Sequence, residues 1–173
     1  MNKIIIAILA VVALVIIQIS LIAAWPPPVR YVNIVVTVVI FISVLTNQEF
    51  GLAWAAGSGF FLDLYSPHAF GLTTLSLVFV SWVVSLLFRQ FFTNRSLYPL
   101  FILGLVGTFF FETVLLLGGH VFSDTLFTPV VFWSWLNIVL WEVGLNVLIL
   151  GLLFITFNRF TDRFHLQLTS FDL

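Results

Sequence analysis

Long apolar segments, separated by short polar or proline- and glycine-containing breaks, dominate the pattern along this chain. A membrane-spanning helix needs about 20 mostly apolar residues, with a usual range of about 17–25. The pattern predicts six such helices, at residues 4–24, 31–46, 51–64, 72–88, 97–117 and 130–157. The third segment is the shortest, so it is either a short tilted span or a re-entrant segment. Five spans are the alternative if it does not cross.

The composition supports the same class. Hydrophobic residues make up 62% of the chain and charged residues only 8%, whereas soluble domains carry about 25% charged residues. The sequence therefore predicts an all-α integral membrane protein, folded as one compact bundle. A net charge of −1 without a basic stripe argues against nucleic-acid binding. The lack of cysteine excludes disulfides and thiolate metal sites.

The basic residues predict the orientation. With six crossings all of them except Arg30 lie on the side of the two termini: Lys3, Arg89, Arg95, Arg159 and Arg163. Because cytoplasmic loops are enriched in Lys and Arg, both termini are expected in the cytoplasm. Residues 1–160 form the predicted bundle and 161–173 a short cytoplasmic tail. The first apolar run is too long for the core of a cleaved signal, so it is predicted to be a retained helix.

The third segment carries small residues at helical spacing. Gly51, Ala55 and Gly59 are four apart, and Ala53 and Gly57 form a second four-apart pair. Such spacing places small side chains on one helical face, where another helix can approach closely. Two interpretations stay open: contact with a partner protein, or packing within the bundle.

Asp63 is an acid in an apolar run, four residues beyond Gly59 and just before Ser66 and Pro67. In one interpretation it is structural, because it could cap a neighbouring helix or bond Ser66 and free amides at the turn. In the other it is functional and pairs with a charge on a partner or gates a proton, although the shallow position weakens the proton role. The topology places Asp63 near the outer interface, at a corner that ends at Gly71.

Two further acids lie deeper in predicted spans. Glu112 is in the fifth and Glu142 in the sixth, where Asn146 follows one turn later and Asn137 lies on a flanking face. Buried polar groups in spans are expensive, so these four residues are candidates for an intramembrane role, or for hydrogen bonds across helices.

Neither a metal site nor an enzyme is predicted. His68, His120 and His165 are isolated and not at ligand spacing. No nucleophile has a base beside it in sequence. We therefore expect a protein without catalytic residues, metal or cofactor.

The stretch GSGFFLDLYS, residues 57–66, followed by Gly71 and an apolar helix, resembles the signature region of the bacterial rod shape-determining protein MreD family. The small size, the basic loop after the fourth helix and the position of Phe111 and Glu112 are similar as well. In the family a proline commonly comes shortly before the later glycine, whereas here Pro67 comes earlier.

The resemblance implies a non-enzymatic component of the cell-elongation machinery in the bacterial inner membrane. Its implied direct partner is MreC, through a groove that Asp63, the small-residue face and the outward loops help to form. Direct or indirect partners would be MreB and a membrane transpeptidase and glycosyltransferase of lateral wall synthesis, with membrane lipid around the bundle. The implied fold is similar to the substrate-binding subunits of energy-coupling-factor vitamin transporters. Such a subunit is the alternative function, although its usual four-apart alanine pair is missing from the first helix.

Overall fold

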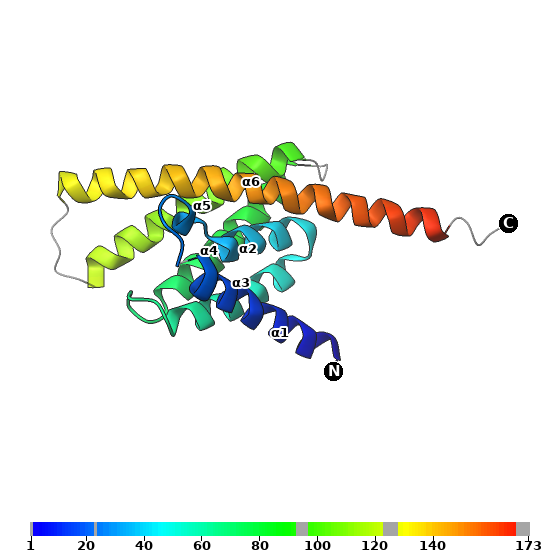
Figure 1. The fold of residues 1–173 in the computed structure, drawn as a ribbon, viewed down its shortest axis with the longest axis horizontal. Coiled ribbons are helices and arrows are strands. Elements are labelled where there is room, and N and C mark those ends of the chain that lie inside the picture. The colour runs from blue at the N-terminus through cyan, green and yellow to red at the C-terminus, as the bar shows by residue number, and fades with distance from the viewer. Residues whose placement is uncertain (1, 23, 93–96, 123–127, 169–173) are drawn as a thin grey trace.

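The computed structural model describes residues 2–22, 24–92, 97–122 and 128–168, with the side chains of 2–4, 122 and 160–168 left aside. Within these ranges every regular element is a helix (Figure 1). The six α-helices are α1 (Asn2–Ile16), α2 (Ile34–Leu45), α3 (Gln48–Asp63), α4 (Leu72–Phe91), α5 (Leu97–Phe122) and α6 (Pro129–Leu168). A π-helical segment, η1 (Ile17–Ile22), prolongs α1, and a 3₁₀ turn, η2 (Val29–Tyr31), precedes α2.

The helices are compatible with an integral membrane protein of the helical class. Four stretches are long and apolar enough to span a bilayer: Ile5–Ile22, Leu72–Phe91, Leu97–Val121 and Pro129–Arg159. The other two helices are shorter. α2 has 12 residues and is strongly apolar, whereas α3 has 16 residues and begins with Gln48 and Glu49.

Local chemistry explains where α2 begins. The predicted second segment starts at residue 31, but the helix starts at Ile34. Asn33 is its N-cap, and the Asn33 side chain accepts a hydrogen bond of 3.1 Å from the backbone N–H of Val36. This bond satisfies an amide that has no partner inside the helix.

The last helix is longer than the sequence pattern predicts. The sixth span was expected to end at residue 157, but α6 continues to Leu168 and has 40 residues. At about 1.5 Å per residue this is a rod of roughly 60 Å, twice the thickness of a bilayer core. Figure 1 shows its C-terminal part, orange to red, extending past the other helices. The predicted tail therefore begins as a continuation of α6, while residues 169–173 lie outside the described part.

The core forms where α2, α4 and α5 meet, with α3 and α6 against them. α2 and α4 supply most of its fully buried residues: Val35, Val36, Val39, Ile40, Leu77, Val80 and Val84. α2 is thus the most enclosed helix, whereas only 17% of the α1 stretch Ile5–Ile22 is buried. A surface rich in exposed Ile, Leu and Phe is expected where lipid, rather than water, is the solvent.

Small polar residues allow the inner helices to approach each other. The hydroxyls of Ser43 in α2 and Ser81 in α4 are 2.8 Å apart and hydrogen-bonded. A Cβ atom added to Gly51 of α3 would lie 2.8 Å from the Ser43 hydroxyl oxygen and 3.2 Å from that of Ser81. Three helices therefore meet at a point where only a glycine fits, as is typical of membrane bundles.

Candidate functional site

Asp63 closes the corner between α3 and α4. Its carboxylate accepts hydrogen bonds from the backbone N–H groups of Thr73 and Thr74, both 2.9 Å long, and from the Thr74 hydroxyl. These amides belong to the first turn of α4, where a helix has no internal partners for them. The structure thus shows the helix-capping role for Asp63. Ser66, the other expected partner, instead accepts a backbone N–H of its own turn.

Gly71 completes this corner. It immediately precedes α4 with a φ of 92°, in the left-handed region. Glycine adopts this conformation without the steric cost that a Cβ atom imposes. Gly71 therefore turns the chain so that the start of α4 faces the Asp63 carboxylate.

The face of α3 that carries Gly51, Ala55, Gly59 and Asp63 is turned into the bundle, where all four residues are buried. A Cβ atom on Gly59 would lie 2.5 Å from the Cα atom of Thr74, so the backbones of α3 and α4 are almost in contact. The structure therefore places this face in intramolecular packing and leaves no room there for another protein.

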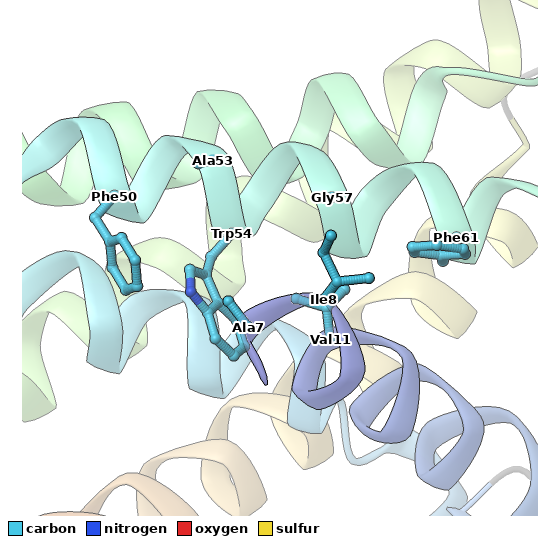
Figure 2. Close-up of a pocket in the computed structure, with 8 residues that line it drawn as sticks. All are labelled: Ala7, Ile8, Val11, Phe50, Ala53, Trp54, Gly57 and Phe61. Carbon is cyan, nitrogen blue, oxygen red and sulfur yellow. The ribbon is translucent and has the colours of Figure 1, made fainter. Parts of the chain in front are cut away.

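The second small-residue pair, Ala53 and Gly57, lies on a different side of α3 and faces α1. Between the two helices is a groove with a cavity of about 330 Å³ (Figure 2). From α1 the groove is lined by Ala7, Ile8 and Val11. From α3 it is lined by three aromatic residues, Phe50, Trp54 and Phe61, and by the small residues Ala53 and Gly57. We call this the α1–α3 groove.

Trp54 is the one residue in the groove lining whose side chain carries a polar group, the indole N–H. Figure 2 shows its ring reaching from α3 toward Ala7 of α1. The indole N–H is buried and has no hydrogen-bond partner among the described residues. The N–H is enclosed by this chain, so Trp54 presents the apolar part of its ring to the groove.

A hydrogen-bond network centred on Asn146 joins α5, α6 and the start of α2. The Asn146 side chain is fully buried. Its oxygen accepts the backbone N–H of Asn33 at 3.0 Å, and its nitrogen donates to the Thr108 hydroxyl at 3.3 Å and to Glu142 at 3.4 Å. The carboxyl group of Glu142 also lies close to that of Glu112. Glu112 of α5 is therefore brought near Glu142 and Asn146, which lie one turn apart in α6.

Asn137 does not join this network, which corrects the expectation that it is a buried polar residue. It is exposed, and it forms no hydrogen bond with Glu142. Asn137 and Glu142 are five residues apart in the helix. At about 100° per residue their side chains point in directions that differ by about 140°, so they lie on different faces.

Glu112 opens onto a second cavity, of about 220 Å³, at the corner of the bundle next to the Asp63 turn. We call it the polar cavity. Its polar lining comes from five elements or their connections: Gln18, Asn33, Ser66, His68, Thr73 and Glu112. Ile19, Leu62, Phe111 and Leu115 supply the apolar part of the wall.

Several of these residues were missed from the sequence. Gln18 bridges η1 and α2: its amide donates to the Val32 carbonyl and accepts the Ile34 N–H, both at 2.9 Å. Gln18 is the single amide in the first apolar run, which is the signal that could have drawn attention to it. Thr73 and Thr108 carry no such signal, because threonines are common in membrane helices.

Among the comparisons with known proteins, the one with protein families gives a match. No curated protein and no solved structure matches the chain, so the expected similarity to energy-coupling-factor subunits is not shown. The family model for rod shape-determining protein MreD matches residues 1–164. This range covers α1 to α5 and all but the last four residues of α6, and it includes the Asp63 corner, both cavities, Glu112 and Glu142. The chain therefore belongs to the MreD family of rod shape-determining membrane proteins.

Proposed function

We propose that this protein is a non-enzymatic component of the cell-elongation machinery that binds MreC and positions it with the enzymes of lateral wall synthesis. The observation that carries this proposal is the family match over residues 1–164. The lining of the α1–α3 groove supports the non-enzymatic part, since it offers no nucleophile and no acid–base side chain.

In the proposed arrangement all six helices cross the bacterial inner membrane and both termini are cytoplasmic. The distribution of basic residues supports this topology. The 16 residues of α3 reach only about 24 Å, less than a bilayer core of about 30 Å. We therefore place its end, the Asp63 corner, slightly below the outer membrane surface.

For the MreC contact we propose the α1–α3 groove, with a single transmembrane helix of MreC as its occupant. The inward face of α3 is already filled by α2 and α4, so the docking surface expected there moves to the side of Ala53 and Gly57. These two residues are four apart and open to the groove, which suits close approach of a helix.

Filling the groove tests this proposal. We expect Gly57→Leu to reduce co-purification of MreC from membranes by about tenfold or more, which corresponds to roughly 1.4 kcal/mol. The physical reason is that the larger side chain occupies the space of the incoming helix. The variant should also fail to restore rod shape in cells that lack the native protein.

The matched control is Gly144→Leu. Gly144 is an exposed mid-helix glycine of α6, and a Cβ atom there would meet nothing within 4 Å. This variant should bind MreC and restore rod shape like the wild type. Normal MreC binding by Gly57→Leu would exclude the groove as the docking surface, and loss of binding in both variants would exclude a specific effect.

A further inference from the structure

We propose that a groove between α5 and α6 binds one acyl chain of a membrane phospholipid. The site is a third cavity, of about 450 Å³, between these two helices. Leu105, Val106, Phe109 and Phe110 line it from α5, and Leu136, Val139, Leu140 and Val143 line it from α6. We call it the α5–α6 groove. The proposal does not depend on MreC binding, because this groove shares no residue with the α1–α3 groove.

The paths of the two helices create the groove. A Cβ atom on Gly104 would collide with the Leu150 side chain, and one on Gly151 would lie 3.3 Å from the Phe101 ring, so α5 and α6 are in close contact there. The groove begins at the next residue of α5 and lies toward the ends of the helices at residues 122 and 129. Figure 1 shows the yellow-green end of α5 turned away from the yellow start of α6. The close contact therefore gives way to a wedge that the side chains do not fill.

The groove opens to the bilayer. Its residues lie within the stretches Leu97–Val121 and Pro129–Arg159, which are long and apolar enough to span a membrane. Val139 is only 4% exposed, whereas Leu105 and Leu140 on either side of the groove are 46% and 65% exposed. Every lining side chain is a hydrocarbon, so the groove offers no hydrogen bond that would hold water or a lipid headgroup. The occupant is therefore a lipid tail or an apolar helix.

The size of the lining side chains favours a lipid tail over a helix. Helices in membranes approach each other closely at Gly, Ala, Ser and Thr, but the smallest side chain among the described residues that line this groove is valine. The α1–α3 groove differs, since Ala7, Ala53 and Gly57 line it. An acyl chain is much thinner than a helix, which is about 10 Å across, and it bends at its methylene groups. It can therefore fill a narrow wedge and make the dispersion contacts that an empty space forfeits.

Lipid photo-crosslinking tests the proposal on the full chain in nanodiscs. The probe is phosphatidylcholine with a diazirine on one acyl chain, in the middle of the chain in one sample and near its end in another, so that different depths are covered. Peptide mass spectrometry locates the crosslinks. Summed over both samples, we expect Leu140 to be labelled about threefold or more above Leu148, although the two side chains are almost equally exposed, at 65% and 66%. Labelling of both residues in proportion to their exposure overturns the proposal.

Filling the groove should displace the acyl chain. We expect Val106→Phe to lower the labelling of Leu140 by about threefold or more and to leave that of Leu148 unchanged. Val121→Phe is the matched control, because Val121 lies in the same helix outside the groove and is 79% exposed. Val143→Phe fills the groove from α6 and decides if Val106→Phe does not fold. Unchanged labelling of Leu140 in the filled groove overturns the proposal. So does a dimer in native mass spectrometry that the filling variant abolishes, because the occupant would then be a second copy of the chain.

Discussion

Asp63 shows how one charged side chain can be stabilised in an apolar segment without any counter-ion. Its two oxygens accept three hydrogen bonds from the first turn of α4. The N-terminal end of a helix also carries a partial positive charge, which favours a carboxylate at that position. The acid is thus satisfied by a neighbouring helix, and its role is to fix the angle between α3 and α4.

Removing this cap should destabilise the bundle. We expect Asp63→Ala to lower the free energy of unfolding by about 1–2 kcal/mol, at the upper end of the range for helix caps. Asp63→Asn keeps an acceptor and should lose less. The measurement is reversible unfolding in detergent, with Glu49→Ala as a control for removal of an exposed acid. Equal stability of Asp63→Ala and the wild type would contradict the capping role.

At the scale of elements, the spacing of small residues indicates that α3 packs tightly. It does not indicate which neighbouring helix each face of α3 contacts. Gly51, Ala55 and Gly59 lie against α2 and α4, while Ala53 and Gly57 face α1. Both sets have the same four-residue spacing, so the sequence predicts two close-packing faces. Their partners depend on the order of helices in space, which no local pattern contains.

The two kinds of glycine predict opposite effects of the same substitution. Gly59→Ala should destabilise the protein by about 1–3 kcal/mol, because its methyl group would collide with the backbone at Thr74. Gly144→Ala should be neutral or stabilising by up to about 1 kcal/mol, because alanine favours helix and the site is open. The unfolding midpoints of the two variants measure this. A Gly59→Ala variant as stable as Gly144→Ala would show that α3 and α4 are not in close contact.

The sequence predicted the elements well and the polar contacts only in part. Six helical segments and the capping option for Asp63 follow from hydrophobic runs and short-range chemistry. Of the network around Asn146, only the contact with Glu142, one turn away, follows from the sequence, because the bonds to Asn33 and Thr108 span 113 and 38 residues. Asn137 was expected to be buried near Glu142 because the two residues are close in sequence. They lie on different faces of α6, so Asn137 is exposed whereas Glu142 is buried.

At the scale of the whole molecule, the lengths of the helices bear on how many of them cross the membrane. Four stretches meet the length criterion, and α2 and α3 are shorter. α2 is nevertheless the centre of the core, with α3 and α4 against it. The two short helices therefore pack against longer ones. A helix shorter than the bilayer core can still cross where the bilayer is locally thinner.

The lack of cysteine makes the topology directly measurable. We expect Tyr65→Cys to react with a membrane-impermeant thiol reagent in intact spheroplasts, and Phe91→Cys to react only after permeabilisation. Both positions are exposed, at 71% and 70%, and they lie at opposite ends of α4. Labelling of the two positions in the reverse order would instead support five spans, with α3 not crossing.

The weak burial of α1 has a consequence for biogenesis. Helices enter the membrane in the order of synthesis, whereas α1 makes most of its contacts to other α-helices with α3, which is synthesised later. α1 must therefore stay in lipid as a lone helix until residues 48–63 have followed, and its largely exposed apolar surface makes it stable there. The contact that forms the groove is thus made after insertion, by two helices that first meet inside the bilayer.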